Sequence, residues 1–78
     1  MPFTSEERAR MQALKGVGDT VIDRLEQIGF TSLAQLADQE ASAITLQISG
    51  LMNSTCWHNS PQARNAIQAI INLARGTA

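Results

Sequence analysis

The chain has few of the residues that cross-link or rigidify a small protein. Its 78 residues include one cysteine, no tyrosine and three other aromatic side chains. A single cysteine cannot form an internal disulfide, so we expect no covalent cross-link and a reducing, cytoplasmic location. A chain of this length has room for only one small core, so residues 1–78 are expected to form a single domain.

Long apolar runs and catalytic motifs are absent as well. The apolar runs are at most three or four residues long, whereas a membrane span needs about 20. Residues 1–10 lack the apolar centre of a secretory signal. The sequence contains no Walker-type loop, no triad order and no paired carboxylates that would serve a pocket. We therefore expect a protein that does not contact membranes, is not an enzyme and needs no cofactor.

Charge is sparse and unevenly distributed. Six basic and seven acidic side chains give a net charge of −1, which is not the strongly basic composition of a tight nucleic-acid binder. No acidic residue follows Glu40, and the only basic residues after it are Arg64 and Arg75. The C-terminal half is therefore expected to present a mildly positive surface.

The spacing of apolar residues predicts an all-α fold, a compact bundle of four or five short helices. Thr4 and Glu7 have the spacing of a capping box, which predicts a first helix from about Ser5 to Leu14. Asp19 is the predicted N-cap of a second helix that ends at Gly29, a residue suited to the left-handed position after a helix.

The second half of the chain predicts further helices. Thr31 or Ser32 is expected to cap a short helix, and Asp38 to begin another that runs to Met52. The alternation of Ile44, Leu46 and Ile48 also fits a strand, but the apolar residues at 51 and 52 favour a helix.

Residues 53–60 are rich in side chains that hydrogen-bond their own backbone, which predicts a loop. Ser60 and Pro61 then have the N-cap and first-turn pairing of a final helix over about 61–75. Leu73 lies off the apolar stripe of that helix, so we expect some apolar surface there to remain available for self-association.

One segment has a recognisable pattern. Leu14-Lys15-Gly16-Val17-Gly18, followed by an amphipathic helix and by residues 28–36, resembles the helix-hairpin-helix family over residues 11–37. The resemblance implies a SAM-like, helix-hairpin-helix architecture. The polar stretch 53–61, the following helix and a cysteine near it are also similar to small bacterial hairpin proteins of the pathogenicity-locus type, whose biochemical role is unknown.

The resemblance implies weak, sequence-independent binding of double-stranded DNA. Two glycines one residue apart leave no side chain between the turn and a ligand, and the helix that follows points free N–H groups at the same place. The family's phosphate contacts correspond to four backbone amides, those of Gly16, Gly18, Thr20 and Val21. Lys15 is expected to add charge, and Arg64 to make a further contact.

The resemblance also implies a monovalent-cation site, formed by the backbone carbonyls of Gln12, Leu14 and Val17. No other metal is expected.

Other features favour a different interpretation. Asp19 stands where many DNA-binding members of the family have an uncharged or basic residue, and the second half lacks a second G-x-G turn. The Gly-Val-Gly turn is then a tight connection between two helices, with Val17 in the core. In that case the fold serves as a scaffold that binds another protein or a second copy of itself.

Cys56, Trp57 and His58 bring a thiol, an indole and an imidazole together. Two ligands do not make a zinc site, and a nucleophilic cysteine needs a third, orienting group, so Cys56 is interpreted as a small buried apolar residue. Trp57 is expected to pack in the core, the alternative being that it stacks on an unpaired base or anchors a partner.

Overall fold

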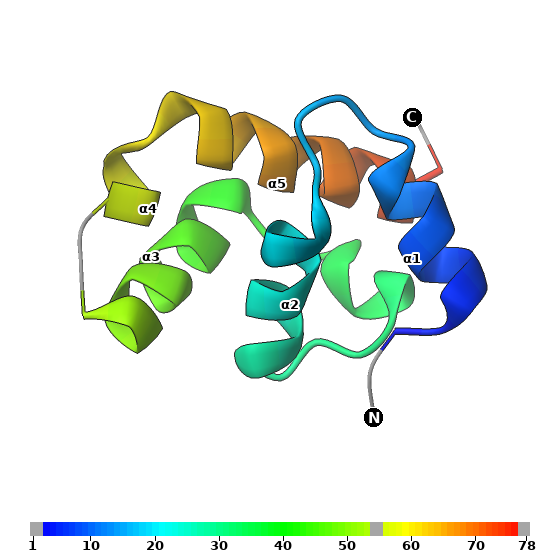
Figure 1. The fold of residues 1–78 in the computed structure, drawn as a ribbon, viewed down its shortest axis with the longest axis horizontal. Helices are drawn as coiled ribbons and strands as arrows, with labels where there is room; N and C mark the ends of the chain where they lie inside the picture. Colours follow the sequence, from blue (N-terminus) through cyan, green and yellow to red (C-terminus); the bar gives the residue numbers. More distant parts are fainter. Residues whose placement is uncertain (1–2, 54–55, 77–78) are drawn as a thin grey trace.

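Helix α5 is the longest element and lies along one side of the molecule, in contact with α2, η1, α3 and α4 (Figure 1). The computed structural model describes residues 3–53 and 56–76. In chain order the elements are α1 (Ser5–Gln12), α2 (Asp19–Gln27), the 3-10 helix η1 (Leu33–Leu36), α3 (Ala41–Met52), α4 (Cys56–Asn59) and α5 (Pro61–Ala74). The described residues contain no strand, so the predicted all-α bundle is confirmed. Within this part of the chain, every helix is too short or too polar to cross a bilayer.

The predicted helix ends at Thr4, Gly29 and Ser60 are confirmed. The Thr4 hydroxyl accepts a hydrogen bond of 3.1 Å from the Glu7 amide, and the Ser60 hydroxyl accepts one of 3.2 Å from the Ala63 amide. Gly29 has a φ of +104°, the left-handed conformation expected after a helix. These side chains and this glycine satisfy backbone groups that helix ends otherwise leave without partners.

Three predicted boundaries are wrong. The N-cap of α2 is Gly18 and not Asp19, because the Asp19 carboxylate turns toward α1 instead. Helix α1 ends at Gln12, two residues before Leu14.

The linker before α3 explains the third error. Helix α3 begins at Ala41 and not at Asp38. The guanidinium of Arg75 donates to the carbonyls of Ala37 at 2.7 Å and Gln39 at 3.2 Å, and so holds this linker outside the helix.

The segment predicted as a loop contains the short helix α4. The buried Ser49 hydroxyl on α3 accepts a 2.8 Å hydrogen bond from the His58 amide and so fixes α4 against α3. Residues 54 and 55 of the same prediction lie outside the described residues. A tertiary contact, which a local sequence pattern does not contain, decides the conformation of this segment.

One apolar core draws buried side chains from α1, α2, η1, α3 and α5, and Trp57 of α4 packs against it. Its centre is the inner face of α5, and Val17 enters it from the turn between α1 and α2. The buried apolar side chains are Phe3, Met11, Val17, Ile22, Leu25, Leu33, Leu36, Ile44, Ile48, Ala66, Ile67, Ile70 and Ile71. Because each helix buries only a narrow stripe, the helices are stabilised mainly by packing on one another.

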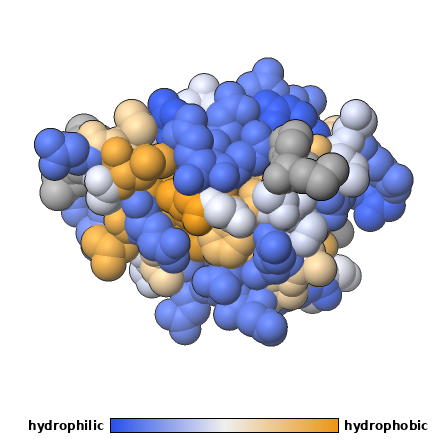
Figure 2. Space-filling view, turned by 90° about the horizontal axis from the view of Figure 1, so that it is seen from below, coloured by the Kyte–Doolittle hydropathy of each residue, from blue (hydrophilic) through white to orange (hydrophobic). Residues whose placement is uncertain are grey.

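The free apolar surface lies chiefly on α3. Leu73 is half-buried and packs against the core, so it leaves only part of its side chain exposed. The large exposed apolar side chains are Leu46, Leu51 and Met52, which we call the α3 patch. In Figure 2, hydrophobic side chains gather on the side of the molecule where α3 lies.

Ile70→Ala tests the core. Ile70 is fully buried on α5, whereas Leu46 is 59% exposed on α3. Both changes to alanine remove three carbon atoms, so they differ in the burial of those atoms. We expect Ile70→Ala to lower the free energy of unfolding by about 2–5 kcal/mol and Leu46→Ala to change it by less than about 0.5 kcal/mol. Urea unfolding followed by circular dichroism measures both, and equal losses would contradict this core.

Candidate functional site

The connection between α1 and α2, residues 13–18, is a tight turn that we call the α1–α2 turn. The Val17 amide donates to the Leu14 carbonyl at 3.2 Å, and the Val17 side chain is buried in the core. Gly16 has a φ of +84°, which side chains other than glycine rarely adopt. Gly18 has extended angles, φ −117° and ψ −178°, which any residue adopts. The fold therefore requires glycine at position 16 but not at position 18.

Free backbone amides converge at the beginning of α2. The first hydrogen bond of α2 runs from the Ile22 amide to the Gly18 carbonyl at 3.4 Å, so the amides between them precede the helical ladder. Among residues 3–53 and 56–76, no protein acceptor binds the four amides expected to meet a phosphate, those of Gly16, Gly18, Thr20 and Val21. A Cβ added to Gly18 would have no neighbouring atom within 4 Å. The space beside Gly18 is thus open, and amides without acceptors at the beginning of a helix bind anions.

The carbonyls expected to hold a monovalent cation belong to the same short segment. Gln12 is the last residue of α1, and Leu14 and Val17 lie in the turn. The Leu14 carbonyl already accepts the Val17 amide, which leaves one lone pair on that oxygen.

The charge beside the turn is organised by Arg8 on α1. Its guanidinium lies 2.8 Å from Asp23, 3.4 Å from Asp19 and 3.4 Å from Glu26, all on α2. The hydrogen bond from Arg8 to Asp23 raises the pKa of the guanidinium. One arginine on α1 thus contacts three acids of α2.

This cluster also changes the role of Asp19. The sequence interpretation placed an uncompensated carboxylate beside the anion-binding amides, whereas the Asp19 carboxylate accepts hydrogen bonds from Arg8 and from the Gln12 side chain. Sequence reasoning missed this arrangement, although Asp19, Asp23 and Glu26 have the spacing of one helix face. The sequence therefore did contain a signal: three acids on one face of α2 indicate that a basic side chain lies against them.

A hollow separates the α1–α2 turn from the first turn of α5. One part, of about 400 Å³, is lined by Gly16, Val21, Trp57, Ser60, Gln62, Ala63 and Ala66. A second part, of about 560 Å³, is lined by Lys15, Gly16, Gln62, Asn65 and Ala66. The two parts share three residues, and we call them together the turn groove. Among the described residues that line the groove, Lys15 is the charged one and none is a carboxylate.

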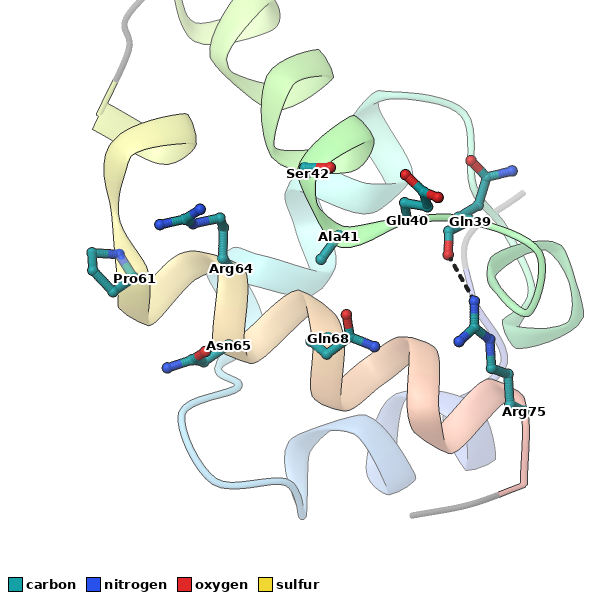
Figure 3. Close-up of a pocket in the computed structure, with 9 residues that line it drawn as sticks. All are labelled: Gln39, Glu40, Ala41, Ser42, Pro61, Arg64, Asn65, Gln68 and Arg75. Carbon is teal, nitrogen blue, oxygen red and sulfur yellow. Dashed lines mark hydrogen bonds between the residues drawn. The ribbon is translucent and has the colours of Figure 1, made fainter.

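Arg64 lies on a different side of α5 from the turn groove. It lines a polar hollow of about 550 Å³ with Glu40, Ser42 and Arg75, as Figure 3 shows. Residues two apart on a helix point in nearly opposite directions, and Gln62 faces the turn. The structure therefore brings Lys15 together with the predicted amides but does not bring Arg64 to them.

Trp57 is half-buried, packs against the core and also lines the turn groove. The side chain of Cys56 lies outside what the structure describes. No group of three potential metal-ligating side chains occurs within residues 3–53 and 56–76.

The sequence matches no protein-family model, and no curated protein or solved structure matches the chain. Inference about function therefore depends on the geometry of the turn and of the groove beside it.

The two glycines of the turn are expected to respond differently to alanine. Gly16→Ala places a Cβ on a residue with positive φ, which costs about 1–3 kcal/mol. At Gly18, alanine caps a helix less well than glycine but has less entropy in the unfolded chain, so we expect a change within about 1 kcal/mol. Chemical denaturation measures both variants, and a Gly18→Ala variant that is less stable than Gly16→Ala would contradict the turn geometry.

Arg8→Gln tests the charge cluster, with Arg10→Gln on the same helix as the matched control. Arg10 pairs with Glu6 alone, and both of these side chains are mostly exposed. We expect Arg8→Gln to lower the thermal midpoint by several degrees and Arg10→Gln to leave it nearly unchanged, because an isolated exposed pair contributes little. Added salt should reduce the difference between the two variants. Equal midpoints at low salt would show that the cluster does not stabilise the fold.

Proposed function

We propose that the α1 and α2 helices form a helix-hairpin-helix module that binds the phosphate backbone of double-stranded DNA weakly and without sequence preference. One observation carries the proposal: among the described residues, the amides of Gly16, Gly18, Thr20 and Val21 have no protein acceptor. The glycine at position 18 supports it, because the backbone there does not require glycine. A residue without a Cβ at this place allows a phosphate to approach the amides closely.

The charge of the site is compatible with a weakly bound phosphate. The Asp19 carboxylate lies 3.4 Å from Arg8, whose single positive charge is shared with Asp23 and Glu26, so its repulsion of a phosphate is reduced but not removed. Lys15 is exposed in the turn and supplies a positive charge beside Gly16. With one lysine in place of a basic patch, binding should be weak and salt-sensitive.

Contact with phosphate oxygens carries no sequence information, and sequence is read by side chains that reach base edges. The turn offers backbone amides and one lysine, so we infer that different duplexes bind alike.

A second candidate function rests on the α3 patch. Leu46, Leu51 and Met52 are exposed on a helix that has no charged residue. An apolar, uncharged face of this kind fits the alternative in which the fold binds another protein or a second copy of itself.

The proposal is tested by titrating the ¹⁵N-labelled protein with a short blunt duplex at low and at physiological salt. We expect shifts in the amide signals of Gly16, Gly18 and Thr20, and weaker binding at higher salt. Gly18→Ala should reduce affinity about tenfold, the equivalent of one charge-assisted hydrogen bond. Gly50→Ala, in the exposed face of α3 and far along the chain from the turn, should leave affinity unchanged. Amides that stay unperturbed at low salt with excess duplex would exclude DNA and leave the α3 patch as the binding surface.

Lys15→Gln tests the electrostatic part separately. We expect it to weaken binding to every duplex alike and to reduce the slope of log affinity against log salt by about one, as for the loss of one phosphate contact. An unchanged slope would show that Lys15 does not contact the backbone.

A further inference from the structure

We propose that the turn groove holds one unpaired nucleobase against Trp57, next to a phosphate bound by the α1–α2 turn. The preferred ligand is then DNA with an unpaired nucleotide, such as a single-stranded overhang. This inference rests on the proposed function, because the phosphate contact brings the nucleotide to the groove.

Trp57 is positioned to offer a ring surface to a ligand. It lies on α4, is half-buried and packs against the core on one side. Its remaining surface lines the groove with Val21 and Ala63, which are apolar. Stacking on an aromatic ring suits any nucleobase, since each has a flat π face.

The phosphate site and the groove are contiguous. Gly16 contributes to both, because it lines both parts of the turn groove and carries one of the free amides. A nucleotide whose phosphate binds the turn therefore has its base beside the groove.

The charge of the groove complements a nucleotide. Lys15 lies at the groove, and no carboxylate lines it. The acids nearest along the chain, Asp19 and Asp23, share Arg8 as a basic neighbour and do not line the groove. Ser60, Gln62 and Asn65 place polar groups along the lining, where a base edge has hydrogen-bonding atoms to satisfy.

The recessed position of Trp57 selects an unpaired base. In a duplex, each base is covered on both faces by its neighbours, so a ring reaches it only by inserting between base pairs. Trp57 lies in a hollow and is half-buried, and so it does not project far enough to insert. A base that is free of the stack can instead enter the hollow, at little cost in unpairing.

Trp57 is the single tryptophan of the chain and reports on the groove directly. The experiment titrates the protein with a blunt duplex and with a duplex that carries a single-stranded overhang and has the same number of phosphates. Trp57 fluorescence and the Gly16 and Gly18 amide signals are followed together. We expect both ligands to shift the amides, and only the overhang to quench the fluorescence and to bind about tenfold more tightly, as for one stacked base.

A groove-filling variant provides the matched test. Ala63→Leu extends a half-buried side chain that lines the groove, and Ala43→Leu makes the same change on the exposed face of α3. We expect Ala63→Leu to abolish the preference for the overhang while the amide shifts with blunt duplex persist. Ala43→Leu should keep both. Circular dichroism establishes that each variant is folded.

The outcomes separate the two proposals. Amide shifts without quenching by the overhang would overturn the nucleobase site and leave the phosphate contact standing. A lack of both signals would overturn both proposals. Quenching that survives Ala63→Leu would place the base elsewhere and would also overturn the groove as its site.

Discussion

The contact between Arg8 and the acids of α2 fixes the part of the molecule on which the proposed function depends. Helix α1 buries a single side chain of its own, Met11, so apolar packing alone holds it weakly. Arg8 binds three carboxylates of α2, and the Glu26 carboxylate also accepts a 3.0 Å hydrogen bond from the Phe3 amide. Charged groups thus replace the apolar area that this short helix lacks.

A second polar contact attaches α1 to the rest of the bundle. The Glu7 carboxylate accepts a 3.0 Å hydrogen bond from the Leu33 amide at the beginning of η1. Because α1 is attached to both η1 and α2, the position at which the turn begins is fixed, and Val17 of the turn lies in the core. The free amides therefore belong to a turn and a helix start that both helices hold in place, and a site that is ordered in advance loses less entropy when a ligand binds.

Local chemistry made part of this fold predictable. Thr4, Gly29 and Ser60 act on backbone groups within a few residues of themselves, so their roles can be read from the sequence. The stripe on α5 was equally clear, since Ile67, Ile70 and Ile71 recur at helical spacing and are buried.

The wrong predictions concern segments whose conformation depends on a contact with a residue far along the chain. Asp is a residue type typical of N-caps, but the Asp19 carboxylate binds Arg8, eleven residues earlier, instead of the helix end. Helix α4 forms because Ser49 accepts a hydrogen bond from the His58 amide, and the linker at 37–40 is held by Arg75.

Within the candidate site, the α1–α2 turn and Lys15 could be predicted from the G-x-G pattern of the sequence. The groove, however, joins Gly16 to Trp57 across 41 positions of the chain, and no local pattern contains that contact.

The contacts of α5 also determine when the chain folds during its synthesis. Among the described residues, α5 supplies four of the thirteen buried apolar side chains, and Arg75 beyond it donates hydrogen bonds to the linker before α3. A nascent chain that has emerged only as far as α3 therefore exposes Ile44 and Ile48 without the helix that covers them. A chain that folds during synthesis therefore lacks this part of the core until residues 66–71 have emerged, and apolar side chains exposed until then favour aggregation.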